Sequence, residues 1–238
     1  MASRRSAELF SAALAGSADV TELPIRLLRA CSDALPVTGV GLALMTERGP
    51  AGTIAATDAP AAALEDLQFT LGEGPCVDAS RSGRPVLQPD LAATAPQRWP
   101  AFAGGALAAG VRAVFALPLR VGAIRLGVLD LYRNSPGALS AGELAEALSY
   151  SDAATLLLLH LQAGSPVAGP PEESMPVLDD RAEVHQATGV VSVHAGVSLG
   201  EALLLLRARA FAEHRAIRDL ARDVLDGVVD FRPDGESE

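Results

Sequence analysis

Hydrophobic positions near the start of the chain change from a helical period to the pattern of strands. In residues 19–36 the apolar side chains recur at helical spacing, and the segment stops at Pro36. These positions are Leu23, Leu27, Ala30 and Ala34. Residues 37–46 and 51–57 have strand character and are separated by a turn at 47–50, so they predict a β-hairpin.

The middle of the chain predicts short mixed elements and then a second hairpin. The mixed elements are a short helix at 74–83, an extended segment at 84–91 and a further helix at 100–110. Residues 111–121 and 123–133 are apolar strands that turn tightly near Gly122. The order of helix, hairpin, mixed middle, hairpin and helix predicts an α+β fold with a mostly antiparallel sheet flanked by helices.

A long helix is predicted over residues 140–162. Ser140 and Glu143 have the spacing of a capping box at its start. The helix is apolar on more than one side, with approximate coiled-coil spacing at Leu144, Leu148, Thr155 and Leu158. Such a helix usually has more than one packing partner. It is either packed between elements of its own domain or the seam of a parallel dimer, and we favour the dimer.

A proline-rich segment with no apolar period, residues 163–176, separates this region from a smaller one. The chain is therefore expected to contain a large domain, a linker, a helical domain and an acidic tail. Their expected ranges are 1–163, 164–178, 179–232 and 233–238.

Capping signals predict the first two helices of the C-terminal domain. Asp180 and Glu183 are spaced to cap the first helix, which Gly196 would end. Ser198 and Glu201 form a capping box for the second. The domain is thus expected to be all-α.

A third helix is predicted from about residue 215 to 228. Its apolar side chains follow the i, i+3, i+4, i+7 period at Ile217, Leu220, Ala221, Val224, Leu225 and Val228. This period gives the helix one buried face.

The third helix also carries an arginine stripe. Arg215, Arg218 and Arg222 fall within roughly 60° of one another around a helix axis. The stripe is either a solvated surface, with i,i+4 pairs to Asp219 and Asp226, or a phosphate-binding surface. The second alternative has a chemical basis because the guanidinium fork matches phosphate oxygens.

Charge does not by itself favour nucleic acid as a partner. The 238 residues carry a net charge of −10, and all 19 basic residues are arginine. Residues 181–232 hold 7 arginines against 7 acidic residues. A nucleic-acid-binding domain is usually basic, so the arrangement of the arginines must support the case.

Candidate chemistry outside the arginines is sparse. The two cysteines and four histidines lack metal-ligand spacing, and no catalytic arrangement is found, so we expect no metal, no cofactor and no enzyme activity. Cys76 and Trp99 are candidate ligand contacts, although core positions explain both residues equally well or better.

The N-terminus is expected to begin a helix rather than to be a signal peptide, because Glu8 interrupts its apolar run. The run at residues 156–161 is far shorter than the roughly 20 apolar residues of a membrane span. These features predict a cytoplasmic protein without membrane contact.

Several motifs of the large domain resemble the GAF family. They are "LGEGPCVDASRSGRPVLQPDL" at 71–91, "RWPAFA" at 98–103 and "GVRAVFALPLRVGAIRLGVLDLYR" at 110–133. The resemblance covers about residues 20–163. It implies a six-stranded antiparallel sheet and a role in dimerisation and in sensing an unidentified small-molecule or redox signal.

The C-terminal helices resemble an ANTAR domain, the RNA-binding module of transcription antitermination regulators. Matching motifs include "QATGVV" at 186–191, "EALLLLRARA" at 201–210 and "LARDV" at 220–224. The resemblance implies binding to RNA stem-loops, two in tandem through a homodimer. The RNA-facing residues it implies are Gln186, Thr188, Gly189, Arg207, Arg209, Arg215, Arg218 and Arg222.

Two departures from the ANTAR pattern keep an alternative open. Many members have a lysine where this chain has Thr188, and members of this subgroup often have arginines where it has Asp226 and Asp230. The alternative is a GAF-based protein whose C-terminal helices serve as a protein-interaction module without RNA binding.

Overall fold

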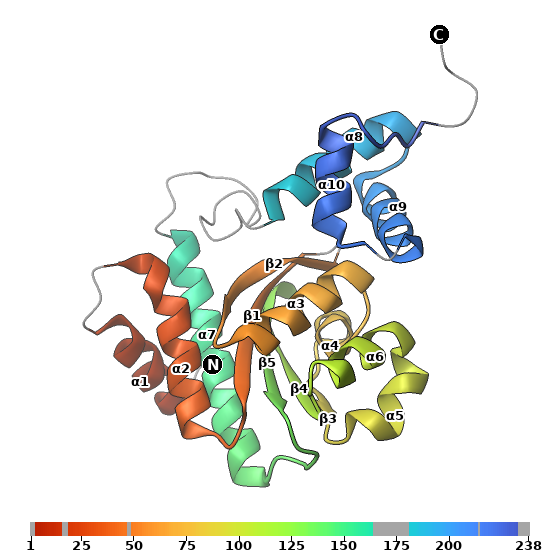
Figure 1. Ribbon diagram of the computed structural model, residues 1–238. Helices are drawn as coiled ribbons and strands as arrows, with labels where there is room; N and C mark the ends of the chain where they lie inside the picture. Colours follow the sequence, from red (N-terminus) through yellow and green to blue (C-terminus); the bar gives the residue numbers. More distant parts are fainter. Residues whose placement is uncertain (1–2, 16–18, 47–48, 164–180, 214, 233–238) are drawn as a thin grey trace. The chain divides into compact units, whose positions relative to one another are not determined.

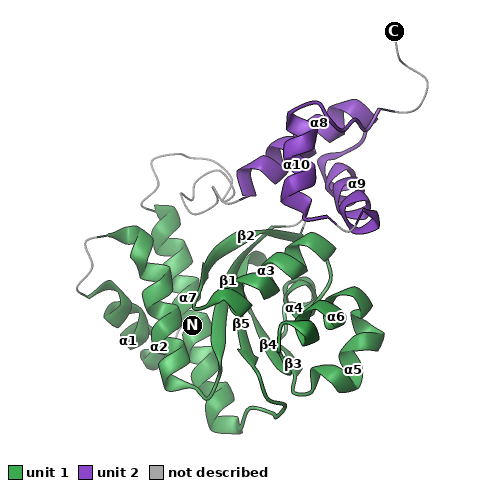
Figure 2. Ribbon diagram, viewed as in Figure 1, with its two compact units in different colours: residues 1–177 green, residues 178–238 purple. Residues whose placement is uncertain are grey.

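The computed structural model describes residues 3–15, 19–46, 49–163, 181–213 and 215–232. The chain divides into two compact units, residues 1–177 and 178–238 (Figure 2). The predicted linker, the acidic tail and the cap residue Asp180 fall outside the described residues.

An antiparallel sheet of five strands forms the centre of the first unit (Figure 1). The strands are β1 (Gly39–Thr46), β2 (Gly49–Ala56), β3 (Val86–Gln88), β4 (Ala113–Val121) and β5 (Ile124–Arg133). Their order is β2-β1-β5-β4-β3, and every neighbouring pair is antiparallel. Both predicted hairpins are present and join through β1 and β5. The described residues form five strands where the GAF resemblance implied six.

The strands of the first hairpin begin pairing closer to its turn than predicted, whereas the second hairpin has the predicted tight turn. Gly49 and Pro50, predicted to lie in the first turn, belong to β2, and Gly49 pairs with Thr46. In the second hairpin Val121 pairs with Ile124, and Gly122 adopts the left-handed φ of 61°. Glycine carries no Cβ penalty in that conformation.

Helices cover both faces of the sheet (Figure 1). On one face lie α2 (Leu23–Ala34) and α7 (Ala141–Ala163), with α1 (Arg4–Leu14) packed on α7. On the other face lie α3 (Ala59–Leu71), α4 (Pro75–Ser82), α5 (Leu91–Arg98) and α6 (Pro100–Ala108). Side chains alternate across the strands, so that Val128 and Tyr132 of β5 join the core beneath α3–α6.

Two helices of the first unit, α3 and α5, were not predicted, although each has a capping signal. The Asp58 carboxylate accepts the N–H of Ala61 at 2.8 Å before α3. The Asp90 carboxylate accepts the N–H of Ala92 at 3.1 Å before α5. Aspartate is among the preferred N-cap residues because its carboxylate satisfies these backbone donors.

The long helix α7 begins with the predicted capping box. The Ser140 N–H donates to Glu143 Oε2 at 2.7 Å, and the Glu143 N–H donates to Ser140 Oγ at 3.3 Å. The prediction of a dimer seam along this helix is contradicted at Leu158, which is fully buried within its own unit. Leu148 is the exposed member of the predicted seam.

The second packing partner of α7 is the N-terminal helix α1. Arg5 of α1 pairs with Glu146 of α7 at 2.6 Å, and the Phe10 and His160 rings meet edge to face with centroids 5.9 Å apart. Leu9 of α1 is buried. The two apolar sides of α7 are therefore explained within one chain.

The second unit is a three-helix domain, with α8 (Ala182–Ala195), α9 (Leu199–Ala212) and α10 (Ile217–Leu225). Gly196 ends α8 in the left-handed conformation, with φ of 64°. Ser198 and Glu201 form both halves of the predicted capping box. Arg181 precedes α8 without a side-chain capping bond.

The third helix is shorter than predicted. It begins at Ile217 rather than near 215, and its C-cap is Asp226. Four members of its predicted apolar face are buried, namely Ile217, Leu220, Ala221 and Val224. Leu225, the last residue of the helix, and Val228, which lies beyond it, are exposed.

Candidate nucleic-acid interface

The arginine stripe is divided between a loop and a helix. Arg215 lies in the loop before α10, whereas Arg218 and Arg222 lie on the helix. The prediction that all three occupy one helical stripe is therefore wrong for Arg215. The Arg215 N–H donates to Ala210 O at 2.9 Å, which holds this loop against the end of α9.

Arg215 is held by carboxylates from two elements. Its Nη2 lies 2.5 Å from Asp223 Oδ2 of α10, and its Nη1 lies 3.4 Å from Glu213 Oε2 after α9. The bond to Asp223 is the main cause that raises the pKa of Arg215. The predicted partner Asp219 is instead within 3.5 Å of Arg222.

Arg222 connects α10 to α8. Its Nε lies 3.0 Å from Glu183 Oε1, and this contact raises the pKa of the Arg222 guanidinium. The predicted partner Asp226 caps the end of α10. The Arg222 side chain remains 55% exposed, so the outer part of its guanidinium can reach another ligand.

Gln186 shares a side of α8 with Glu183, the partner of Arg222. It is exposed on α8, three residues after Glu183, and residues at i and i+3 share one side of a helix. The Arg222–Glu183 contact therefore joins Arg222 to the side of α8 on which Gln186 lies.

Two other members of the predicted RNA-facing set are less accessible. Thr188 is buried, and its hydroxyl donates to Val184 O at 2.6 Å within α8. The expectation that Thr188 contacts RNA is corrected on this ground, since its only polar side-chain atom faces its own helix. Gly189 is half-buried, and a Cβ added there would meet no atom within 4 Å.

Two further members of the predicted RNA-facing set, Arg207 and Arg209, lie on α9. Arg207 is half-buried. Arg209 pairs with Glu213 at 2.8 Å, donates to Asp230 O at 3.0 Å and lies over the Phe231 ring at 5.1 Å. Arg209 thus fastens the segment after α10 to α9.

Asp230, one of the two departures from the ANTAR pattern, has local partners. Its Oδ1 accepts the N–H groups of Phe231 at 2.7 Å and Arg232 at 3.0 Å, and these bonds lower its pKa. His194 Nδ1 lies 3.0 Å from the same oxygen. Part of the negative charge of Asp230 is therefore balanced inside the domain.

The candidate ligand contacts of the first unit are core residues. Trp99 is buried, its Nε1 donates to Asp78 Oδ2 at 3.2 Å, and its ring meets Phe102 edge to face with centroids 6.3 Å apart. Cys76 is also buried, and its backbone N–H donates to Gln68 Oε1 at 2.8 Å.

Two buried acidic residues that the sequence analysis did not single out, Glu65 and Asp130, lie close to Cys76. Ligand atoms of Glu65, Cys76 and Asp130 all lie within 4.8 Å of one another. Burial is the largest effect on Asp130 and raises its pKa to about 6, partly offset by the hydrogen-bonding side chains of Cys76, Glu65 and Gln68. The available signal was Asp130 itself, an acidic residue in the otherwise apolar run "LGVLDLY".

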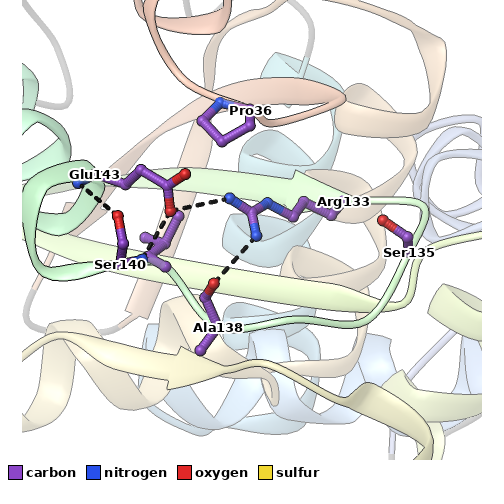
Figure 3. Close-up of a pocket in the computed structure, with 7 residues that line it drawn as sticks. Pro36, Arg133, Ser135, Ala138, Ser140 and Glu143 are labelled. Carbon is purple, nitrogen blue, oxygen red and sulfur yellow. Dashed lines mark hydrogen bonds and ion pairs between the residues drawn. The ribbon is translucent and has the colours of Figure 1, made fainter.

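An open hollow lies where β5 leads into α7 (Figure 3). Arg133 crosses it, with Nη1 3.2 Å from Ala138 O and Nη2 3.5 Å from Glu143 Oε2. The guanidinium also lies 5.6 Å from the Phe115 ring centroid. Because the Arg133 guanidinium is bonded to Ala138 and Glu143, we assign it the structural role of holding the loop before α7.

The described residues include no single helix that is long and apolar enough to cross a membrane. Helices α8 and α9 pass that test only as a pair, and they are bent by 104° at their junction.

Comparison with known folds defines the class of the first unit. The GAF domain of an Acinetobacter phosphoenolpyruvate-protein phosphotransferase has a TM-score of 0.52, with 12% identity over 68% of this chain and 95% of that one. A domain assigned to a two-component sensor histidine kinase protein from Sinorhizobium meliloti 1021 has a TM-score of 0.50, with 18% identity over 62% of this chain and 96% of that one. At these identities the likeness concerns the fold.

Family models identify both units. The GAF domain model matches residues 17–158 and the ANTAR domain model matches residues 177–225. The chain belongs to the GAF family and carries an ANTAR domain after its GAF domain. A search of curated proteins finds no significant match. The pairing supports a regulator in which a GAF domain controls an ANTAR domain.

Proposed function

We propose that this protein binds RNA stem-loops through its ANTAR domain and thereby regulates transcription antitermination. A signal at the GAF domain controls this binding by shifting the population of an RNA-competent state. The protein acts in the cytoplasm as a homodimer. Two ANTAR domains in one dimer engage two hairpins together, which raises the effective concentration of the second domain.

The observation that supports RNA binding most directly is the Arg222–Glu183 contact between α10 and α8. Glu183 and Gln186 share one side of α8, so the exposed Gln186 lies on the side of α8 that Arg222 reaches. Guanidinium groups suit phosphate oxygens, and an amide can hydrogen-bond the edges of unstacked loop bases. The proposed RNA-facing residues are therefore Gln186, Arg215, Arg218 and Arg222.

The carboxylates that pair with these arginines regulate the interface without blocking it. Exposed ion pairs are worth about 0–1 kcal/mol, so a phosphate group can replace Glu183 at small cost. The neutral balance of this domain then makes binding depend on the fit to a hairpin more than on net charge. Salt weakens such binding because phosphate contacts release counterions.

The test is a titration of the full-length protein against a labelled RNA with two small-loop hairpins. We expect binding that weakens as salt rises and that is lost in the variant Arg215→Ala/Arg218→Ala/Arg222→Ala. An RNA of the same length without hairpins is the control ligand. Absence of binding at low salt, by protein that is folded and dimeric, would overturn the proposal.

The exposed apolar side chains of the ANTAR domain favour a second candidate function, a protein-interaction module. Leu204 is 64% exposed and Phe211 is 62% exposed. They are seven residues apart on α9 and therefore share one side of it. Leu204→Ser/Phe211→Ser should abolish a protein contact at this surface, measured as a fall in molar mass by light scattering. The same variant should leave RNA affinity per domain unchanged.

A further inference from the structure

Three chemically reactive side chains from three elements meet in the interior of the GAF domain. Glu65 comes from α3, Cys76 from the first turn of α4 and Asp130 from β5. Figure 1 shows both helices on the same side of the sheet. Their ligand atoms lie within 4.8 Å of one another, and the three residues are 3%, 1% and 5% exposed.

The sheet leaves room for this cluster. Asp130 pairs with Gly41 of β1 on one side and with Ala116 of β4 on the other. Residues directly opposite in an antiparallel pair share a face. A Cβ added at Gly41 would clash with the Glu65 carboxylate, so the glycine admits this side chain.

The environment of the Asp130 carboxylate distinguishes this cluster from the apolar core around it. Neither oxygen of the Asp130 carboxylate has a described partner in good hydrogen-bond geometry, although Cys76, Glu65 and Gln68 lie near enough to affect its pKa. None of those three neighbours is a cation. Carboxylates are costly in the interior unless a positive charge or a metal balances them.

We propose that Glu65, Cys76 and Asp130 bind one divalent transition-metal ion, such as zinc or ferrous iron. A thiolate with two carboxylates suits these ions, whereas Mg²⁺ and Ca²⁺ prefer oxygen ligands alone. Metal–ligand distances of about 2.0–2.3 Å place tetrahedral ligand atoms roughly 3.3–3.8 Å apart. We expect side-chain rotations on metal binding to bring these atoms, which lie within 4.8 Å of one another, to that spacing.

Binding also requires a change of protonation and an entry route. The Cys76 thiol loses its proton to solvent when it becomes a thiolate ligand, so metal uptake releases protons. Gln68 Oε1 accepts the Cys76 N–H at 2.8 Å and fixes the start of α4, which makes Gln68 a positioning residue. Since all three ligands are buried, the ion enters through local opening of the layer formed by α3 and α4.

Cobalt(II) titration of the full-length protein tests this site. The protein is first dialysed against a chelator, and Co²⁺ is then added while thiolate-to-cobalt charge-transfer absorption is followed. We expect one Co²⁺ per chain, with displacement by Zn²⁺. Asp130→Asn should weaken affinity at least tenfold, whereas Asp66→Asn, at an exposed neighbouring position on α3, should leave it unchanged.

The two cysteines provide a matched pair of variants, because the chain contains no others. Cys31, buried beneath the opposite face of the sheet in α2, serves as the control. Cys31→Ala should keep the charge-transfer band and Cys76→Ser should lose it. If Cys76→Ser fails to fold, retention of the band in Cys31→Ala still assigns it to Cys76. A missing band in the parent protein, or its loss in Cys31→Ala, would overturn the proposal.

Discussion

In the GAF domain two carboxylates and a thiol lie in the interior, whereas in the ANTAR domain carboxylates meet arginines at the surface. A carboxylate interacts with a neighbouring charge more strongly in the interior than at the surface. Two charges 4 Å apart interact by about 1 kcal/mol in water and about 4 kcal/mol at an effective dielectric constant of 20. The buried cluster therefore favours one kind of ligand, a metal cation. The surface arginines can exchange a carboxylate partner for a phosphate group.

The aromatic residues of the two domains should show the largest difference in stability. Trp99→Ala removes a buried ring and is expected to cost about 3–5 kcal/mol of unfolding free energy in the GAF domain. Phe211→Ala removes an exposed ring of α9 and should change the stability by less than about 0.5 kcal/mol. Denaturant titration measures both variants. Circular dichroism is the signal to follow, because Trp99→Ala removes the only tryptophan and with it the tryptophan fluorescence.

A Trp99→Phe variant serves as a packing control and should lose less than Trp99→Ala. A cost below about 1 kcal/mol for Trp99→Ala would show that the ring is not part of the core and would restore it as a candidate ligand contact.

Alkaline pH should destabilise the GAF domain through Cys31. Burial raises the pKa of this thiol from 9.0 to about 12, so the unfolded chain loses the proton first. The contribution is complete below pH 9 and is lost as pH rises toward 12. Its slope is about 1.4 kcal/mol per pH unit. The difference in slope between the parent protein and Cys31→Ala, measured by urea unfolding, isolates this group.

Acid pH, rather than alkaline pH, should destabilise the ANTAR domain. Hydrogen bonds from Ser198 lower the pKa of Glu201, and the bond from Arg209 lowers that of Glu213. Stability from these groups is present above their usual pKa of 4.5 and is lost as pH falls below it. Equal acid sensitivity in Glu201→Gln and the parent protein would contradict this.

The capping box of α9 should have a smaller effect. Ser198→Ala removes the oxygen that accepts the Glu201 N–H at 3.3 Å and is expected to cost about 1 kcal/mol. Ser198→Asp restores an N-cap acceptor and should recover most of the loss. Thermal unfolding monitored at a helical wavelength separates the two variants, and an unchanged Tm in Ser198→Ala would refute the capping role.

The smallest stability change is expected at the exposed pair of Arg222 and Glu183. Glu183→Gln should alter the unfolding free energy by less than about 1 kcal/mol, because both side chains are well exposed. It should strengthen RNA binding, since Arg222 then has one carboxylate competitor fewer. Binding that weakens in Glu183→Gln would show that Glu183 positions Arg222 rather than competes for it.

Local signals predicted most of the fold. Both hairpins, the capping boxes at Ser140 and Ser198 and the end of α8 at Gly196 were correct because each depends on residues close in sequence. The helices α3 and α5 were missed despite aspartate caps. The C-terminal end of α10 was placed too far along the chain because apolar Val228 extended the pattern beyond the turn at Gly227.

The candidate sites depended more on contacts distant in sequence. The predicted partners of Arg215 and Arg222 followed helical spacing, but Arg215 lies outside the helix and Arg222 reaches α8. Glu65, Cys76 and Asp130 are brought together by the pairing of β1 with β5 and by the position of α3 and α4. No spacing rule along one segment could have found that cluster.

The most direct test of the account is the salt dependence of RNA affinity in matched variants. Anisotropy titrations of the two-hairpin RNA at several salt concentrations give the slope of log K against log[salt] for the parent protein, Arg222→Gln and Arg232→Gln. Each lost phosphate contact should reduce the slope by about 0.7–0.9. We predict that Arg222→Gln reduces it by about this amount and that Arg232→Gln, beyond α10, leaves it unchanged. Equal slopes in the parent protein and Arg222→Gln would contradict a phosphate-binding role for the α10 arginines.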